Sequence, residues 1–159
     1  MAIRNIRKMG DEVLRKPSKE IKEMTSRTML LIEDMFDTMY EAYGVGLAAP
    51  QVGILKRLVV IDTYEGQPLV LINPKIVEKD GEQIGDEGCL SLPGKVAVVK
   101  RPNHVVCEAL DRDMNPIRVE GEGLLARAIC HELDHLDGVL YPDVAEEPVR
   151  DVEEEEEQG

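Results

Sequence analysis

The feature that most constrains the fold of this chain is one strongly apolar helical stretch near its C-terminal end. It runs from about Glu122 to Asp137 and is followed by Gly138, a residue typical of helix ends. Its wide apolar face consists of Leu124, Leu125, Ala128, Ile129, Leu133 and Leu136. A helix with so wide an apolar face is stable when it is largely buried, so the rest of the chain has to surround it.

The segments that precede this helix are suited to surround it. Short β-type runs, separated by Gly, Pro, Asn and Asp turn signals, occupy 58–61, 69–72, 76–77, 96–99, 105–110 and 117–119. An amphipathic helix is predicted further upstream, from about Thr25 to Tyr43, with Gly44 as its C′ residue. We therefore predict an α+β fold with an N-terminal helix, in which mostly antiparallel strands pack around the buried C-terminal helix.

Length and charge limit the domain count and the classes of partner. The chain has 159 residues, which fits one domain, and its net charge of −13 argues against a general nucleic-acid or anionic-membrane binder. We predict a folded domain over 1–145 and a disordered acidic tail over 146–159, because the glutamates at 153–157 repel one another. Neither a signal peptide nor an apolar run of about 18 residues is present, so we expect a cytoplasmic protein with no membrane span and reduced cysteines.

The C-terminal helix carries the strongest chemical signal, His131-Glu132-Leu133-Asp134-His135. Residues four apart lie one turn apart on the same face of a helix, so the two imidazoles can bind one metal ion. Glu132 projects about 100° away, where it reaches a water on that ion without being a ligand. Two of the chain's three histidines are placed here, on a helix where unpaired polar side chains would be costly.

A catalytic ion usually has three protein ligands and one open position, so a third ligand is needed. One class of metalloprotease continues the motif as His-x-x-Gly-x-x-His, but here Gly138 matches and the last position is Tyr141. The downstream alternatives are three carboxylates, at Asp143, Glu146 and Glu147. Upstream, Cys89 lies in a turn-rich stretch and would complete a Cys-His-His-water set. A single Cys is more often a small buried apolar residue, but beside a two-His site its interpretation as a ligand gains weight.

A third segment, Gly44 to Gly53, is small, apolar and punctuated by glycine, so the backbone of a ligand can approach it closely. It lacks the Lys and the Ser or Thr of a phosphate-binding loop and follows no clear strand, which argues against phosphate binding. Gln51 is its only strongly polar side chain. This side chain is either a contact for a ligand or a surface residue of a tight turn.

Together the three segments resemble the motifs of the peptide deformylase family. The family motifs are Gly-x-Gly-x-Ala-Ala-x-Gln, Glu-Gly-Cys-x-Ser and His-Glu-x-x-His, and they stand here in that order at 44–51, 87–91 and 131–135. Each motif alone is weak to moderate evidence, whereas their conjunction is specific. The resemblance covers about residues 1–145. It implies a metal-dependent hydrolase that removes the formyl group from the N-terminal methionine of newly made polypeptides and releases formate.

The resemblance also implies a chemical role for each motif. The metal ligands would be Cys89, His131 and His135. Glu132 would act first as the general base and then as the acid, while the Gln51 amide and the backbone N–H of Leu90 would form the oxyanion hole. The ion is usually Fe(II) in this family, and Zn(II), Ni(II) or Co(II) can substitute, because a Cys-His-His set suits several first-row metals.

The substrate side of the site follows from the same resemblance. The expected substrate contacts are Gly44, Val45, Gly46, Gly88, Leu124 and Ala128. Gly46 and Gly88 would present backbone groups to a peptide that adds as a strand. Glu87 and Arg101 are candidates for an ion pair that braces the Cys89 loop, and they are equally compatible with two unrelated surface charges. Cys130 is expected to be an inert packing residue.

The expected partners are formyl-methionyl nascent peptides and, transiently, the ribosome. Many bacterial family members carry a basic helical C-terminus that helps to dock the ribosome, whereas this chain ends in acidic residues. Ribosomal RNA should repel an acidic tail, so docking through 146–159 is doubtful.

Three other functions are weighed against this interpretation. An endopeptidase would need a ligand downstream of His135, where Tyr141 stands. A metal-storage protein would need a closed four-ligand site, for which His104 and Cys107 are the remaining candidates. A related hydrolase that acts on another acylated amine would carry the same motifs, so the sequence separates it poorly.

Overall fold

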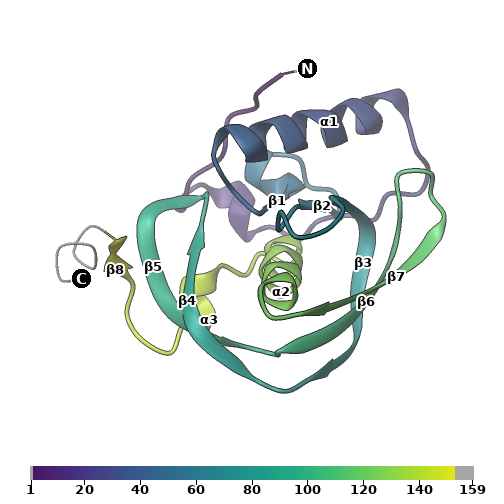
Figure 1. The fold of residues 1–159 in the computed structure, drawn as a ribbon. Helices are drawn as coiled ribbons and strands as arrows, with labels where there is room; N and C mark the ends of the chain where they lie inside the picture. Colours follow the sequence, from purple (N-terminus) through teal and green to yellow (C-terminus); the bar gives the residue numbers. More distant parts are fainter. Residues whose placement is uncertain (1, 153–159) are drawn as a thin grey trace.

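Strands curve around one central helix in the computed structural model, which describes residues 2–152 (Figure 1). The central helix is α2 (Leu124–Leu136). One antiparallel sheet has the order β1-β2-β3-β6-β7 and a second has the order β4-β5-β8. The strands are β1 (Gly46–Ala48), β2 (Leu58–Ile61), β3 (Leu69–Asp80), β4 (Gln83–Cys89), β5 (Leu92–Arg101), β6 (His104–Leu110), β7 (Pro116–Glu122) and β8 (Arg150–Asp151). The α+β prediction, with antiparallel strands packed around the C-terminal helix, is confirmed.

Helix α2 is buried because strands cover it on several sides. Ala126, Ile129 and Leu136 are fully buried and pack with residues of β2, β3 and β6 in one core cluster. The cluster also includes Cys130, which is 6% exposed and therefore has the packing environment expected of it. Burial of so many aliphatic side chains is the main stabilising term for a helix of this kind.

Helix α1 (Ser26–Glu41) covers the far side of the five-stranded sheet, above β1 and β2 in Figure 1. The Thr25 hydroxyl caps its N-terminus by accepting a hydrogen bond from the Thr28 N–H (3.1 Å). Its apolar side packs Ile32, Met35 and Met39 into a second core cluster.

The C-terminal end of α1 differs from the prediction that Gly44 is the C′ residue. Tyr43 takes that place with a left-handed backbone (φ 59°), and its N–H donates to the Tyr40 carbonyl (3.1 Å). The N–H of Gly44 donates to the Met39 carbonyl (2.9 Å), which completes a Schellman motif. Glycine is needed at position 44 for steric reasons, because a Cβ there would lie only 2.6 Å from Leu90 Cδ1.

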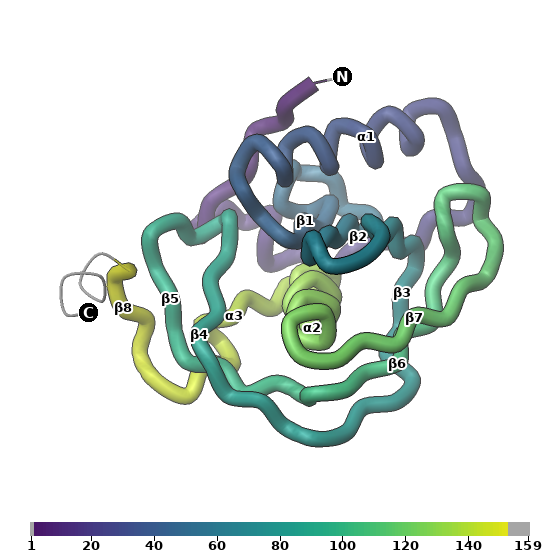
Figure 2. The backbone as a smooth tube through the Cα atoms, viewed as in Figure 1, coloured from purple at the N-terminus to yellow at the C-terminus, as the bar shows by residue number. Residues whose placement is uncertain are grey.

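Two strands that line a cleft, β1 and β4, were not predicted as strands. The segment of β4 was interpreted as a turn-rich stretch, because Gly85, Asp86 and Gly88 disfavour strands, but it pairs with β5 along 83–89. The segment of β1 was interpreted as part of a glycine-rich turn, and it pairs with β2. Both are edge strands, and Figure 2 shows them on adjacent sides of α2.

The C-terminal segment also differs from the expected tail. Glu146 donates its N–H to the Val98 carbonyl (2.8 Å), Val149 packs beside Val99, and β8 pairs with β5. Arg150 forms an ion pair with Asp86 of β4 (2.6 Å). The residues of 146–151 therefore have fixed structure, whereas the glutamates at 153–157 lie outside the described residues and the boundary at 145 stays a prediction. Within 2–152, no helix is long and apolar enough to cross a membrane.

Candidate metal centre

Helix α2 and the end of β4 bring three metal-binding side chains together. His131 and His135 lie one helical turn apart, with 3.3 Å between their Nε2 atoms. Cys89 ends β4, and its Sγ lies 3.3 Å from His135 Nε2. The ligand atoms of these three residues all lie within 4.8 Å of one another. The Cys-His-His group is the only such group of His, Cys, Asp or Glu in the part of the chain that the structure describes.

The chemistry of this donor set fits a first-row divalent ion. Thiolate and imidazole are the ligands that zinc, iron and related ions share. One ring nitrogen of His131, Nδ1, lies 2.6 Å from Glu87 Oε2, which leaves Nε2 directed at Cys89 and His135. A carboxylate that holds the far nitrogen of a ligand imidazole is typical of protein metal sites.

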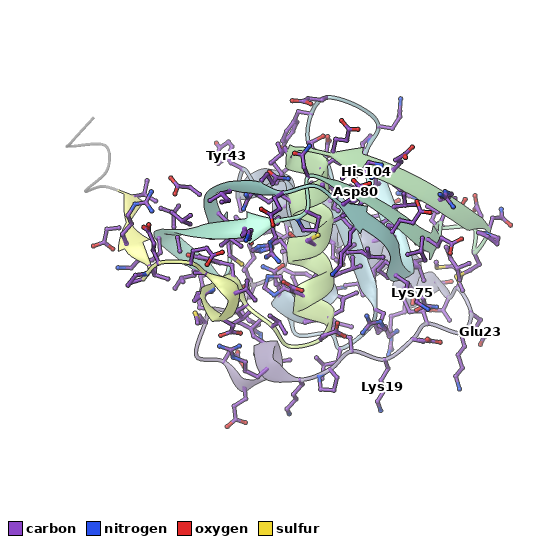
Figure 3. All side chains as sticks on the ribbon, turned by 90° about the horizontal axis from the view of Figure 1, so that it is seen from below. Lys19, Glu23, Tyr43, Lys75, Asp80 and His104 are labelled. Atoms are coloured by element: carbon purple, nitrogen blue, oxygen red, sulfur yellow. The ribbon has the colours of Figure 1, made fainter. Side chains whose placement is uncertain are left out.

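The alternative ligands are engaged elsewhere. Asp143 accepts hydrogen bonds from Arg15 and from the Leu140 N–H. Tyr141 is 2% exposed and stacks on the His131 ring, with centroids 6.2 Å apart. His104 lies at the surface beside Asp80, where Figure 3 labels both, and its ring also contacts Glu120. A downstream ligand is therefore not part of the described site.

Cys107 belongs to the core rather than to the site. It is fully buried, and burial raises the pKa of its thiol to about 11. Since neither Cys107 nor His104 joins the group, the described residues provide no closed four-ligand site of the kind that a storage protein would need.

Glu87 is held by donors on both of its oxygens. Arg101 donates to Oε1 through Nε (3.0 Å) and to Oε2 through Nη2 (2.7 Å), which confirms the predicted ion pair. Arg127 also donates to Oε1 (2.9 Å) and to the Val99 carbonyl (3.1 Å). Burial alone would raise the pKa of Glu87, but the hydrogen bonds from His131 and Arg101 lower it to about 2. Glu87 is therefore ionised, and the His131 Nδ1 donates to it.

Arg127 is the contact that sequence reasoning missed. Its orientation was not predicted, although a charged residue on the apolar face of a buried helix needs a partner. This need for a partner was the only sequence signal that could have indicated the role of Arg127. In the structure, its partner is Glu87. Arg101 extends the same network to Asp134 (2.7 Å), so both arginines tie α2 to the second sheet.

The surroundings shift the pKa values of the two site histidines in opposite directions. Burial lowers the pKa of His131, but the charge of Glu132 and the contacts with Cys89 and Glu87 raise it well above its usual value. The pKa of His135 is lowered well below its usual value by burial and by the His131 charge. The negative groups around His131 favour positive charge at this position, whether as a proton or as a metal ion.

Glu132 lies beside this group without joining it. It is 4% exposed, and burial raises the pKa of its carboxyl to about 7. Its Oε2 lies against Gly46 so closely that a Cβ on Gly46 would be 2.5 Å away. Its Oε1 has no hydrogen-bond partner among the described residues. A carboxyl with a pKa near neutrality is suited to accept a proton and to return it.

Gln51 reaches the same place from the glycine-rich segment. It is 1% exposed, which excludes the interpretation as a surface residue. The Ala48 N–H fixes its Oε1 (2.9 Å), so its Nε2 points towards Ser91 Oγ (3.1 Å) and Cys89 Sγ (3.6 Å). Two backbone N–H groups of the N-terminal segment brace this arrangement, from Arg7 to the Gln51 carbonyl and from Met9 to the Ser91 carbonyl (2.7 Å each).

A cleft of about 600 Å³ opens onto these groups. The expected substrate contacts Gly44, Val45, Gly46, Gly88, Leu124 and Ala128 all line it, together with Leu90, Cys89, His131 and Glu132. It also has lining residues that were not predicted, among them Arg127, Leu92 and Lys95. No motif pointed to Leu92 or Lys95, because they enter the cleft through the fold of β5.

Comparison with known proteins agrees with this geometry. The sequence profile of the polypeptide deformylase family matches residues 3–151. The peptide deformylase of Lachnoclostridium phytofermentans is 63% identical over 99% of this chain and 100% of that protein. The peptide deformylase of Agathobacter rectalis is 61% identical over 96% of each chain.

Solved structures show the same likeness. A peptide deformylase from Legionella pneumophila superposes with a TM-score of 0.87 at 47% identity, covering 89% of this chain and 85% of that one. A peptide deformylase from Synechococcus elongatus in complex with actinonin gives a TM-score of 0.86 at 48% identity, covering 89% of this chain and 78% of that one.

Proposed function

The chain belongs to the polypeptide deformylase family, which removes the formyl group from N-terminal methionine, and on that premise we propose how its own residues carry out the hydrolysis. Cys89, His131 and His135 hold one divalent ion, and the observation that carries this assignment is the approach of their ligand atoms to within 4.8 Å of one another. When bound, the ion would act as a Lewis acid that favours ionisation of the attacking water.

Glu132 moves the proton. Its carboxylate takes a proton from the attacking water and later gives it to the leaving amine of methionine, so formate and a free N-terminus result. Burial supports this role, because it raises the pKa of Glu132 to about 7, and at neutral pH both protonation states are then populated. Gly46 supports it as well, because the missing Cβ leaves room for the carboxylate.

Gln51 and Leu90 stabilise the oxyanion. The Gln51 amide is oriented before the substrate arrives, because the Ala48 N–H holds its oxygen (2.9 Å). The backbone N–H of Leu90 follows Cys89 directly and lines the same cleft. A preoriented donor of this kind typically contributes about 10²–10³-fold in rate.

The substrate peptide adds as a strand between the edges of β1 and β4. The Val45 carbonyl accepts from the Asp62 N–H (2.8 Å), so on this strand the backbone groups of Gly46 point to the other side, towards the cleft. Gly88 presents the opposing backbone from β4. The methionine side chain occupies the apolar part of the cleft beside Val45, Leu124 and Ala128.

The cellular setting belongs to the same proposal. Fe(II) is the ion expected in the cell, with Zn(II), Ni(II) or Co(II) as substitutes, since the ligand set suits all four. The enzyme acts in the cytoplasm on formylated nascent peptides and meets the ribosome transiently. Docking through the acidic segment 146–159 is not part of this proposal, because RNA phosphates repel carboxylates.

The test is the Glu132→Ala variant with formyl-Met-Ala-Ser as substrate. We expect the variant to retain its metal, because Glu132 is not a ligand, and to lose at least about 10²–10⁴-fold in kcat for formate release, the usual loss for a general base. Formate is measured by a coupled assay and metal by elemental analysis on anaerobically purified protein. Turnover close to that of the unmodified enzyme would refute the assigned role.

Acetyl-Met-Ala-Ser serves as the control substrate. It keeps the amide and the methionine, but the added methyl group has to fit beside Gln51 and Leu90. Release of acetate as fast as formate would indicate a general deacylase instead. Cleavage of the internal Met-Ala bond would indicate an endopeptidase.

A further inference from the structure

The aromatic residues of this chain are distributed unevenly. It has one Phe, four Tyr and no Trp. Tyr141 is buried, whereas Phe36, Tyr40, Tyr43 and Tyr64 belong to the end of α1 and the loop after β2, with Tyr43 92% and Tyr64 60% exposed. We call these four residues the aromatic face. Exposed aromatic groups that gather in one place are typical of binding surfaces.

Three rings of the aromatic face contact one another. The rings of Phe36 and Tyr40 stack with centroids 6.0 Å apart, and those of Tyr40 and Tyr64 are 6.2 Å apart. The Tyr64 hydroxyl donates a hydrogen bond to the Gly44 carbonyl (3.1 Å), and Tyr43 precedes Gly44 in the chain. Since Tyr43 and Gly44 line the cleft, one end of the aromatic face lies at the mouth of the active site.

The other end of the aromatic face leads to a second hollow. This hollow has a volume of about 310 Å³, and Phe36 and Tyr40 line it together with Leu69, Val70 and Ile117. The aromatic face thus extends from the mouth of the catalytic cleft to a separate, partly apolar depression.

The two most exposed rings are carried by residues with an unusual backbone conformation. Tyr43 and Tyr64 both have left-handed backbone conformations, with φ of 59° and 65°. For a residue other than Gly, Asn or Asp this costs roughly 1–2 kcal/mol. The Schellman motif at the end of α1 accounts for the backbone of Tyr43, but packing does not account for its ring, which is 92% exposed. Figure 3 shows Tyr43 projecting from the side of the molecule opposite Lys19 and Glu23.

The cleft directs a bound peptide towards these rings. The reacting end lies at Gly46, next to Glu132, and at Cys89. From there the chain leads outward from the start of β1 through Val45 and Gly44 to Tyr43, which lies in the turn after α1. A peptide that starts with its formylated methionine opposite Gly46 and follows this path in an extended form reaches Tyr43 at about its fourth residue.

We propose that the aromatic face binds the nascent chain from about its fourth residue onward. The inference rests on the proposed substrate orientation and extends it beyond the cleft. The occupant is an extended segment with apolar or basic side chains. Apolar and aromatic side chains bury against the rings, and Lys or Arg contacts the ring faces near the exposed carboxylates of Glu41 and Glu65.

Three substrates test this docking surface. They are formyl-Met-Ala-Ser, the extended formyl-Met-Ala-Ser-Phe-Lys-Leu, and formyl-Met-Ala-Ser-Gly-Ser-Gly of the same extended length. We expect a kcat/KM about three- to tenfold higher for the Phe-Lys-Leu peptide than for the other two, mainly through a lower KM, which is the effect of one or two aromatic contacts. The readout is the ratio of kcat/KM between long and short substrates within each enzyme.

Variants assign the effect to the aromatic face. Tyr43→Asn removes the ring but suits the left-handed backbone, so the protein folds and the ratio should fall towards one. Tyr64→Phe keeps the ring and should keep the ratio, whereas Tyr64→Asn should lower it. The matched control is Leu30→Asn, which alters an exposed apolar residue (51%) near the other end of α1 and should leave the ratio unchanged.

Each failure has a separate meaning. Equal kcat/KM for all three peptides in the unmodified enzyme, or an unchanged ratio in Tyr43→Asn, would overturn the docking inference alone. A concentration-dependent dimer in sedimentation that Tyr43→Asn converts to monomer, without any length effect, would show that the face joins two copies of this chain. Absence of formate from every peptide would overturn the proposed function itself.

Discussion

Glu87 shows how much of the site depends on residues that do not touch the substrate. Its two carboxylate oxygens accept four hydrogen bonds, two from Arg101, one from Arg127 and one from His131. A buried carboxylate is tolerated when it is paired and fully hydrogen-bonded. The same bonds fix the His131 ring, so the charge network orients the proposed ligand.

Gly46 brings the backbone close to the carboxylate of the proposed general base, Glu132. We predict that Gly46→Ala lowers kcat/KM by about 10²-fold, because a Cβ placed 2.5 Å from Glu132 Oε2 forces the carboxylate to move. The fold should persist, since the obstacle is the end of one side chain. Steady-state formate release and circular dichroism measure the two effects.

Gly66→Ala is the control for Gly46→Ala. A Cβ at Gly66 meets nothing within 4 Å, so the substitution adds the same methyl group without a contact. Unchanged activity in Gly46→Ala, or an equal loss in both variants, would contradict the close-approach explanation.

At the scale of elements, the spacing of apolar residues predicted the helices and strands that bury a whole face or are buried completely. The apolar face of α2 and the aliphatic runs of β2 and β6 appear at nearly the predicted bounds, because burial of aliphatic side chains determines them. The runs at 69–72 and 76–77 are one strand, β3, whose irregular pairing with β6 near Ile76 breaks the alternation.

The elements that form the site were the harder ones to predict. Strands β1 and β4 carry Gly46, Gly88 and Cys89, and their glycines and acidic residues have low strand propensity. Pairing with β2 and β5 stabilises them, which is a tertiary effect that a local pattern does not contain. The helix with its two histidines was accessible to residue-level reasoning, which also raised Cys89 as the third ligand, and the family resemblance then strengthened that interpretation.

The C-terminal segment allows a prediction about one element, β8. A chain that ends after Ala145 should be less stable by about 1–3 kcal/mol, because it loses the Glu146–Val98 hydrogen bond, the packing of Val149 and the Arg150–Asp86 pair. A chain that ends after Val152 should stay within about 0.5 kcal/mol of the full chain. Urea unfolding followed by circular dichroism measures both, and equal stability of the two shortened chains would argue that β8 contributes nothing.

At the scale of the whole molecule, the proposed metal site joins two parts of the fold. His131 and His135 belong to α2, which packs in the core of the five-stranded sheet, whereas Cys89 ends β4 of the three-stranded sheet. Arg127 links the same two parts through Glu87, and Arg101 links them through Asp134. An ion bound by all three ligands would therefore resist separation of the two sheets as well as supply chemistry.

This arrangement predicts that metal binding stabilises the whole protein. An ion that binds the folded state alone, at about 100 times its Kd, adds about 2.7 kcal/mol, which corresponds to a rise in Tm of about 5–10 °C for a chain of this size. Protein stripped by a chelator should show this rise when Zn(II), Ni(II), Co(II) or anaerobic Fe(II) is returned, as measured by calorimetry.

Two variants test which residues bind the ion. Cys89→Ala should lose most of the rise in Tm, because a ligand from β4 is missing. His104→Ala removes the one histidine outside the site and should keep it. An equal rise in Cys89→Ala and the unmodified protein would mean that the ion binds elsewhere, and the assignment of the ligands would fail with it.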